Sequence, residues 1–294
     1  MATPAQWLEG ARPRTLPAAV SPVLVGTGVA VFEHHAVWWK ALLALVVAVA
    51  LQVAVNYAND YSDGVRGTDA ARVGPLRLVG SGAASPGAVK TAAFASFGMA
   101  AVAGLVLAAA TAWWLVVVGL VCMVAAWYYT GGRNPYGYHG LGEVMVFVFF
   151  GLVAVLGTTY VQTLAVPWPA WLGAIGTGSL ASAILVANNL RDIPTDRDSG
   201  KHTLAVVLGD QRSRLLFVLT LVVAAASVVG LTVGYTAWAM LGFAFLAAAG
   251  PAARTVLGGA QGRDLIPVLQ GAGVAELLYA AGLFVGLLVG STAG

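Results

Sequence analysis

The chain is short of charged residues. Asp, Glu, Lys and Arg make up 9% of its 294 residues, whereas soluble globular domains carry about 25%. Hydrophobic residues make up 59%, and the mean hydropathy is +0.84. Because so few charges cannot cover the surface of a soluble protein of this length, the composition excludes an ordinary soluble enzyme and predicts an integral membrane protein.

Cysteine and net charge are also scarce. The single thiol, Cys122, lies in an apolar run, so it can form neither a disulfide within the chain nor a cysteine-based metal site. The net charge of +3 indicates how basic residues flank a membrane, and no nucleic-acid partner is expected. No cleavable signal peptide is expected either, because residues 1–17 are mixed polar and no small-residue cleavage site follows a short apolar core.

Long apolar runs, by contrast, fill most of the chain. A membrane-spanning helix needs roughly 20 mostly apolar residues. Such runs predict an all-α membrane protein that forms one intramembrane domain over residues 1–294. Nine transmembrane helices are expected, at about 15–32, 37–58, 88–110, 112–129, 141–163, 169–190, 212–233, 236–253 and 266–290.

The basic residues predict the orientation. If nine helices alternate across the membrane, Lys40 alone falls on one side and the other 14 Lys and Arg residues fall on the opposite side, which is therefore assigned to the cytoplasm. The N-terminus is then cytoplasmic and the C-terminus external. The long polar loops are expected to form a cytoplasmic cap over a site that opens on that side, and they comprise residues 59–87, 130–140 and 191–211.

Two acidic clusters stand at the cytoplasmic ends of the second and sixth predicted helices. The first lies in VNYANDYSDGVRGTD (55–69), where Asn56, Asp60 and Asp63 have helical spacing. The second lies in VANNLRDIPTDRDSGKHTLA (186–205) and also places an amide before carboxylates, namely Asn188, Asp192 and Asp196. The shared pattern indicates one common site and hints at an internal repeat; ordinary solvated helix ends are the alternative.

Clustered carboxylates need compensation, because they repel one another. Mg²⁺ supplies it, since this ion binds through a few carboxylates and completes its shell with water and phosphate oxygens. A diphosphate at headgroup level with a hydrophobic tail in the bilayer describes a polyprenyl diphosphate. Basic side chains beside the clusters can neutralise further phosphate charge, and they are Arg66, Arg72, Arg77, Arg191, Arg197 and Lys201.

Both acidic segments resemble the paired aspartate-rich motifs of the UbiA superfamily of intramembrane prenyltransferases. Segments 11–28, 74–82 and 128–151 are further similar to the MenA branch, which prenylates 1,4-dihydroxy-2-naphthoate in menaquinone synthesis; they read ARPRTLPAAVSPVLVGTG, GPLRLVGSG and YYTGGRNPYGYHGLGEVMVFVFFG. The resemblance follows nearly the whole chain in order. The first motif departs from the common NDxxDxxxD pattern, because position 67 is Gly and Asp69 is displaced by two residues.

The resemblance implies nine helices around a central cavity in a bacterial cell membrane. It also implies Mg²⁺-dependent transfer of a polyprenyl group from its diphosphate to an aromatic acceptor. The acceptor would be 1,4-dihydroxy-2-naphthoate, whose carboxylate would leave as CO₂ to give demethylmenaquinone. The implied catalytic and metal-binding carboxylates are Asp60, Asp63, Asp192 and Asp196, with Asn56 and Asn188 as polar partners.

Further polar residues are candidates for substrate binding. Lys201 is a candidate ligand of the diphosphate, and Arg14 is a candidate for the diphosphate or the acidic acceptor. Arg133 and Tyr138 lie in the loop that resembles the MenA branch and can line the cap. A membrane anchor is the alternative role for Arg14, and an ordinary turn is the alternative for the loop.

Two acidic residues lie inside predicted helices. Glu143 opens the fifth helix, where it either stabilises the helix N-terminus through the dipole or serves the reaction. Glu276 has apolar neighbours in the ninth helix and is expected to face the bundle interior or a partner, with no role assigned.

Other functions compete with this interpretation. Within the superfamily, the acceptor could instead be 4-hydroxybenzoate or homogentisate. A secondary transporter is the alternative of another class, although its polar residues would lie near the membrane midplane and not at one face. A CDP-alcohol phosphotransferase is excluded, because Arg66 and Gly67 occupy the wrong places after Asp63. No feature of the sequence sets the prenyl chain length or the oligomeric state.

Overall fold

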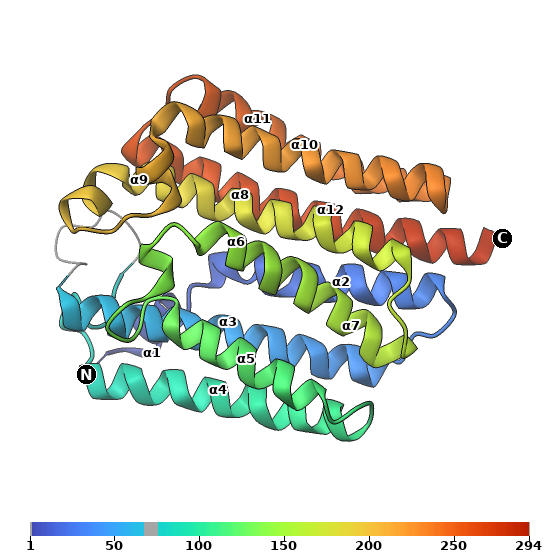
Figure 1. Ribbon diagram of the computed structural model, residues 1–294, viewed down its shortest axis with the longest axis horizontal. Coiled ribbons are helices and arrows are strands. Elements are labelled where there is room, and N and C mark those ends of the chain that lie inside the picture. Colours follow the sequence, from blue (N-terminus) through green and yellow to red (C-terminus); the bar gives the residue numbers. More distant parts are fainter. Residues whose placement is uncertain (1, 68–75, 294) are drawn as a thin grey trace.

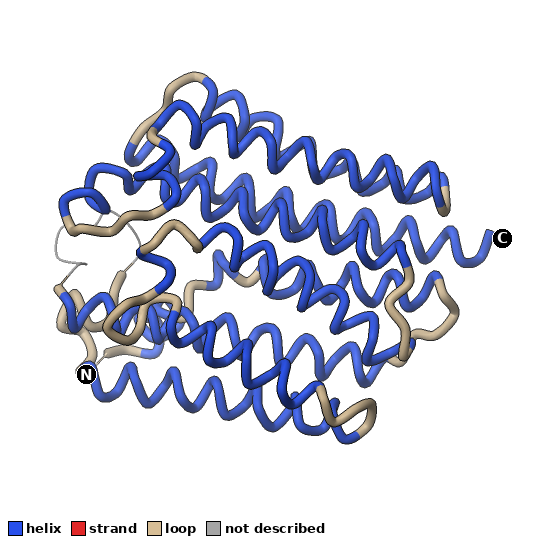
Figure 2. Tube along the Cα trace, in the orientation of Figure 1, coloured by secondary structure: helices blue, strands red, loops and turns tan. Residues whose placement is uncertain are grey.

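The structure is a computed structural model that describes residues 2–67 and 76–293, and every regular element in this part is helical. The long helices lie side by side along the molecule, and the two termini lie at opposite ends (Figure 1). Most connecting loops lie at the two ends of the bundle (Figure 2). The elements are α1 (Pro4–Gly10), η1 (Pro13–Thr15), α2 (Pro17–Phe32), α3 (Trp38–Arg66), α4 (Pro86–Ala109), α5 (Leu115–Tyr128), η2 (Tyr136–Tyr138), α6 (Gly142–Val146), η3 (Phe147–Val153), α7 (Ala154–Thr163), α8 (Trp168–Asp198), α9 (Leu204–Leu208), α10 (Asp210–Gly234), η4 (Ala237–Phe245), α11 (Leu246–Leu257), η5 (Gly262–Leu265) and α12 (Ile266–Ala293).

The helices identify a multi-pass membrane protein, but they do not confirm nine spans. Each predicted range contains helix, yet among the described residues 7 helices are long and apolar enough to cross a membrane, or up to 8 if the bent pair Pro4–Thr15 and Pro17–Phe32 is one span. Helix α5 has only 14 residues. At 1.5 Å per residue it reaches about 21 Å, which is short of a hydrocarbon core of about 30 Å.

Two helices extend further than the sequence analysis predicts. Helix α3 continues to Arg66 and α8 continues to Asp198, so both acidic motifs are helical and the predicted loops 59–87 and 191–211 are wrong at their starts. Helix α3 ends at Gly67, whose left-handed φ of 74° suits a glycine C-cap. The apolar runs end earlier than the helices because the last turns carry polar side chains.

Helix α8 meets the segment that contains η3 backbone to backbone. A Cβ on Gly151 would lie 2.6 Å from the Cα of Gly178 and 2.7 Å from the carbonyl oxygen of Ala174. Only glycine fits such an approach, and small residues at helix contacts are typical of membrane bundles. This contact sets how closely the α6–α7 segment lies against α8.

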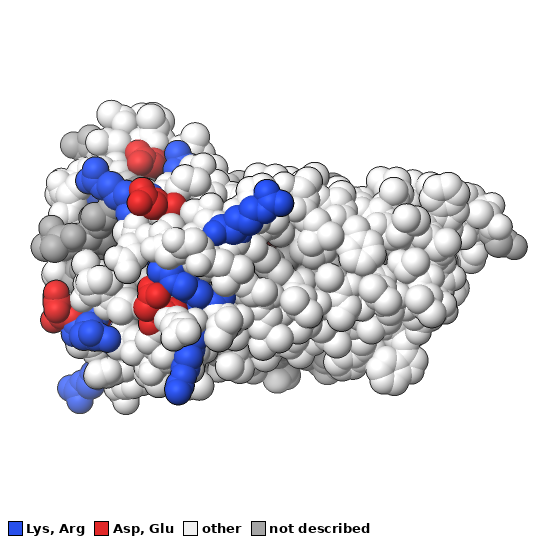
Figure 3. Space-filling view, turned by 90° about the horizontal axis from the view of Figure 1, so that it is seen from above, with Lys and Arg blue, Asp and Glu red and all other residues white. Residues whose placement is uncertain are grey.

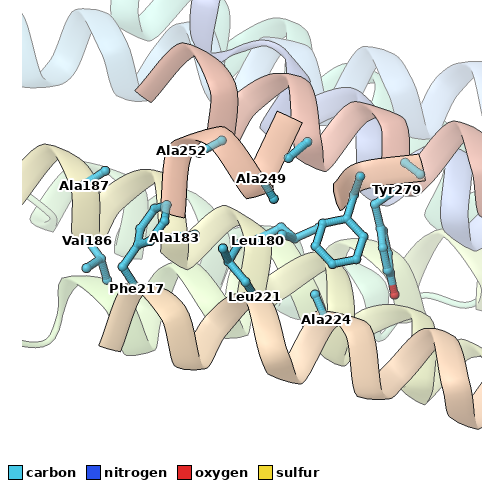
Figure 4. Packing of buried hydrophobic residues seen from close by; sticks show 14 of the residues in the cluster. Leu180, Ala183, Val186, Ala187, Phe217, Leu221, Ala224, Ala249, Ala252 and Tyr279 are labelled. Atoms are coloured by element: carbon cyan, nitrogen blue, oxygen red, sulfur yellow. The ribbon is translucent and has the colours of Figure 1, made fainter. Parts of the chain in front are cut away.

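The largest apolar cluster joins α8, α10, α11 and α12. Figure 4 shows Phe217 and Leu221 of α10 pointing toward α8 and α11, where small alanines leave room for them. Tyr279 of α12 is fully buried, and its hydroxyl lies 2.7 Å from Ser227 Oγ of α10. Close packing and internal hydrogen bonds hold such helices together in lipid, which offers no hydrophobic driving force between them.

Charged side chains gather at one end of the molecule (Figure 3). We call this the polar end; it holds the C-terminal turns of α3 and α8, residues 130–140 and α9. At the opposite end, Lys40 Nζ donates to Thr111 Oγ1 at 3.1 Å. Exposed tryptophans of that end are Trp38, Trp39, Trp113, Trp114, Trp168, Trp171 and Trp238. The charge asymmetry is therefore real in space, whereas the cytoplasmic location of the polar end stays a prediction.

Candidate active site

Asp60 of α3 binds the backbone of a distant segment. Its two carboxylate oxygens accept the amide N–H groups of Leu78 at 2.8 Å and Val79 at 3.0 Å, and the residue has 0% exposure. Amide donors stabilise the buried carboxylate without any cation. The predicted role of Asp60 as a metal ligand is therefore joined by an observed one, which is to attach residues 78–79 to α3.

Asp63, one turn further along α3, collects side chains from three segments. Tyr138 donates its hydroxyl to Asp63 Oδ1 at 2.6 Å, and Lys201 Nζ lies 3.7 Å from the same oxygen. Arg77 Nη2 lies 3.8 Å from Oδ2. The Lys201 ammonium also sits 4.6 Å from the centroid of the Tyr138 ring. The structure thus brings together Asp63, Tyr138 and Lys201, which the sequence analysis had selected separately.

The loop 130–140 is attached to the same end of α3. Thr130 donates its hydroxyl to Asn59 Oδ1 at 2.7 Å, and the guanidinium of Arg66 donates to the carbonyls of Thr130 and Gly132. Within the loop, Tyr136 donates to the Ala125 carbonyl at 2.8 Å, and burial raises the pKa of Tyr136 to about 12, so its hydroxyl stays a donor. Arg66 therefore serves as a clamp on this loop in the described arrangement.

Asn56 holds the N-terminal turn against α3. Its side-chain amide donates to the Ala11 carbonyl at 2.9 Å and to Thr15 Oγ1 at 3.0 Å. This turn carries two arginines with different surroundings, since Arg14 is exposed while Arg12 is half-buried. Arg12 has a left-handed φ of 54°, and its Nη2 atom is buried without a hydrogen-bond partner among the described residues. Arg12 is thus a cation available to an anionic substrate.

In the acidic motif of α8, the first aspartate pairs with an arginine of the same helix. Arg191 donates from Nε and Nη2 to the two oxygens of Asp192, both at 2.6 Å, and its Nη2 also reaches Asn188 Oδ1 at 2.8 Å. Asp196 Oδ2 accepts the hydroxyl of Thr203 at 3.4 Å, and its backbone carbonyl accepts the amide of Lys201 at 2.8 Å. Lys201 links the two motifs, because it follows the second motif in the chain and contacts Asp63 of the first.

Several predicted residues are not drawn into these contacts. Arg133 is exposed, as is Arg14, so their roles stay predictions. Arg72 and Asp69 lie outside the described residues. The sequence analysis overlooked Arg12 as a ligand candidate, although it shares the ARPRTLP stretch with Arg14. It also assigned nothing to Asn189, whose amide donates to Glu143 Oε1 at 2.8 Å.

The donor chemistry of the site suits a hard cation shared with a substrate. Over residues 2–67 and 76–293, no group of three or more His, Cys, Asp or Glu side chains is placed to hold a metal ion alone. The available donors are carboxylate and amide oxygens, which Mg²⁺ prefers, and Mg²⁺ commonly keeps only one or two carboxylates beside phosphate and water. Asp63, Asp192 and Asp196 offer such oxygens, and Asp63 and Asp192 each already face a cation of this chain.

Comparison with known proteins is consistent with this arrangement. The model of the UbiA prenyltransferase family matches residues 19–265. A protein of Mycobacterium tuberculosis named 1,4-dihydroxy-2-naphthoate octaprenyltransferase is 57% identical over 280 residues, which cover 95% of this chain and 96% of that protein. The apo structure of a UbiA homolog from Aeropyrum pernix K1 superposes with a TM-score of 0.71 at 16% identity, covering 91% of this chain and 97% of that one.

A second solved structure adds ligands to the comparison. The UbiA homolog from Archaeoglobus fulgidus bound to DMAPP and Mg²⁺ superposes with a TM-score of 0.63 at 16% identity, covering 97% of this chain and 99% of that one. At such identities the solved structures establish a shared fold. Together with the family match and the 57% identical relative, they show that this chain is a prenyltransferase of the UbiA family.

Proposed function

We propose that the chain transfers a polyprenyl group from polyprenyl diphosphate to 1,4-dihydroxy-2-naphthoate, with release of CO₂ and diphosphate, to give demethylmenaquinone in its reduced, quinol form. The observation that carries the proposal is the 57% identity, over nearly the full length of both chains, to a relative named for this reaction. The polar end of this chain supports it with anion-binding side chains beside carboxylates, Lys201 and Arg77 next to Asp63.

In the reaction, the C1–O bond of the prenyl diphosphate breaks and its electron pair leaves with the diphosphate. A ring carbon of the acceptor supplies the pair for the new C–C bond, and the electron pair of the departing carboxylate returns to the ring. Mg²⁺, when bound with the diphosphate, supplies a Lewis acid that stabilises the growing negative charge. Carboxylate oxygens of Asp63 and Asp196, at the C-terminal ends of α3 and α8, would hold it.

The cations of the polar end bind and orient the diphosphate. The contact of Lys201 to Asp63, at 3.7 Å, is longer than a good hydrogen bond, so the Lys201 side chain can turn toward phosphate at small cost. The aromatic ring of Tyr138 limits where the Lys201 ammonium can go. Packed helices exclude water from the allylic cation, which water would otherwise quench.

The prenyl tail then lies among apolar helices and lipid, and the polar end opens to the cytoplasm of a bacterial cell. This placement follows from the basic residues, 14 of 15 of which fall on one predicted side. No contact at the site favours 4-hydroxybenzoate or homogentisate as the acceptor, and the identity to the named relative favours dihydroxynaphthoate.

An acceptor panel tests the proposal. Purified protein in lipid nanodiscs receives Mg²⁺, a polyprenyl diphosphate and one of three acceptors, and products are identified by mass spectrometry. We expect prenylated product only from 1,4-dihydroxy-2-naphthoate, with a mass that lacks the carboxyl group. Efficient prenylation of 4-hydroxybenzoate or homogentisate in its place would overturn the acceptor assignment while leaving the family intact.

A further inference from the structure

Glu143, in the first turn of α6, has one carboxylate oxygen that the fold leaves unpaired. The residue is 6% exposed, and Oε1 accepts the side-chain amide of Asn189 at 2.8 Å. Its other oxygen, Oε2, is buried without a hydrogen-bond partner among the described residues. Buried polar atoms are nearly always satisfied, because leaving one unpaired is costly. A partner from outside the chain would remove that cost.

The position of Glu143 ties it to the polar end. Asn189, which holds Oε1, lies one helical turn before Asp192 on α8, and an α-helix rises about 1.5 Å per residue, so Asn189 is only about 5 Å deeper along the helix axis. Ser182 of α8 also donates its hydroxyl to the backbone carbonyl of Glu143 at 3.2 Å. Glu143 is therefore fixed just below the second acidic motif, on the side away from the end of the bundle.

The loop before Glu143 brings it near the first motif as well. Residues 130–140 carry Tyr138, which donates to Asp63, and only a few residues separate Tyr138 from Glu143. At Gly142, a Cβ would lie 3.2 Å from Leu185 of α8, so the turn that presents Glu143 is packed against that helix. Glu143 is thus connected to both acidic motifs, through Asn189 to the second and through the loop of Tyr138 to the first.

Glu276 offers a contrast within the same chain. It is also fully buried, and both of its oxygens lack hydrogen-bond partners in the described part of the structure. Over residues 2–67 and 76–293 no side chain donates a hydrogen bond to it, and its neighbours on α12 are apolar. In Glu143 one oxygen is held by an amide and the other is left over, which is the arrangement expected of a carboxylate aimed at a ligand.

We infer that Glu143 Oε2 accepts a hydrogen bond from a ring hydroxyl of the aromatic acceptor, with Asn189 as the positioning residue. A carboxylate acceptor strengthens such a bond. It also draws the hydroxyl proton away from the ring oxygen, so the ring becomes a better nucleophile toward the prenyl cation. The inference rests on the proposed function, and it assigns the site a class of ligand, a hydroxylated aromatic ring bound through its hydroxyl.

The test combines a protein variant with a substrate variant. In Glu143→Gln, Asn189 still holds the oxygen, so the NH₂ group faces the acceptor and cannot accept its proton. We expect kcat/KM for 1,4-dihydroxy-2-naphthoate to fall roughly 10- to 100-fold, as for loss of a hydrogen bond to a charged group. The KM for the prenyl diphosphate should stay within about twofold.

The substrate variants are the two monomethyl ethers of the acceptor, each of which blocks one ring hydroxyl. With the wild-type protein, kcat/KM should be lower for one ether than for the parent acceptor, by a factor similar to that of the Glu143→Gln substitution. With Glu143→Gln, kcat/KM should differ little between that ether and the parent acceptor. Equal losses for both proteins on both ethers would show that Glu143 does not contact a hydroxyl. If wild-type protein prenylates no acceptor at all, the proposed function fails. That outcome differs from the failure of this inference alone, in which Glu143→Gln prenylates the acceptor as well as the wild type does.

Two further variants keep the test decisive. Glu276→Gln, another buried glutamate, should leave the discrimination between hydroxyl and ether unchanged, and the same loss in both variants would indicate a packing effect. If Glu143→Gln does not fold, Asn189→Ala decides, because it frees Oε1 without altering the carboxylate. We expect it to reduce the hydroxyl-to-ether discrimination about three- to tenfold, in line with loss of one neutral hydrogen bond, and an unchanged ratio would overturn the inference.

Discussion

The acidic end of α3 contacts distant segments, whereas at the acidic end of α8 an aspartate pairs with an arginine of the same helix. On α3, Asp60 holds the backbone at residues 78–79 and Asp63 meets Tyr138 and Lys201. On α8, Asp192 is neutralised by the neighbouring Arg191. Two motifs that look like repeats therefore differ in their contacts: the first holds the surrounding segments, and the second includes an arginine beside its first aspartate.

Metal removal is expected to have the largest effect, because it removes the one partner that both helix ends would share. EDTA should abolish prenyl transfer by purified protein, and excess Mg²⁺ should restore it. The readout is product formation by mass spectrometry, with a Ca²⁺ arm that tests the need for a small octahedral ion. Full activity in EDTA would mean that the two ends do not cooperate through a metal.

Asp63→Asn should come next, with roughly a hundred- to thousandfold loss of turnover, the range for removal of one key electrostatic group at a reacting centre. The amide keeps the size of the side chain but removes the charge that Tyr138, Lys201 and the metal share. The matched control is Asp198→Asn, an exposed carboxylate at the end of α8. A wild-type rate for Asp63→Asn would place the site elsewhere.

Asp60→Asn should act chiefly on stability. An asparagine NH₂ group would face a backbone N–H, which leaves a buried donor unpaired and costs about 1–3 kcal/mol. Thermal unfolding in detergent should show a lower Tm, while turnover per folded molecule should fall far less than for Asp63→Asn. If turnover collapses at an unchanged Tm, Asp60 is a metal ligand like Asp63 and the contrast inside α3 disappears.

The N-terminal turn held by Asn56 gives the smallest expected effect. Arg12→Gln should raise the KM for one anionic substrate about tenfold, equal to about 1.4 kcal/mol, near the lower limit for a bond to a charged group. Arg14→Gln is the matched control, because Arg14 is exposed two residues away. Titrating each substrate in turn shows which anion Arg12 serves. Equal effects of the two variants would mean that general positive charge, and not the buried cation, is what matters.

The helical architecture was predictable because apolar runs mark helices directly. The ends of α3 and α8 were not, since their last turns carry the polar residues that a hydropathy pattern assigns to loops. The predicted meeting of the two motifs is supported by the contact between Lys201 and Asp63. Their helical spacing indicated a common face, which is a local property that sequence does carry.

The partners of individual side chains were beyond the sequence. The bonds from Leu78 and Val79 to Asp60 depend on how the chain returns to α3, and no spacing encodes that return. The contrast between Arg12 and Arg14 depends on the left-handed turn at Arg12. The orphan oxygen of Glu143 becomes visible only when every possible partner around it has been placed. Such features arise from packing of segments that are distant along the chain.

The contact between Gly151 and Gly178 has a mechanical consequence for the site. Because no side chain lies between the two backbones, they are already in contact and cannot move closer. Glu143 lies on the segment that contains Gly151, and Asn189, its hydrogen-bond partner, lies on α8 with Gly178. A residue with a side chain at either glycine would therefore force α8 and this segment apart, and it would shift Glu143 relative to Asn189 without contacting either of them.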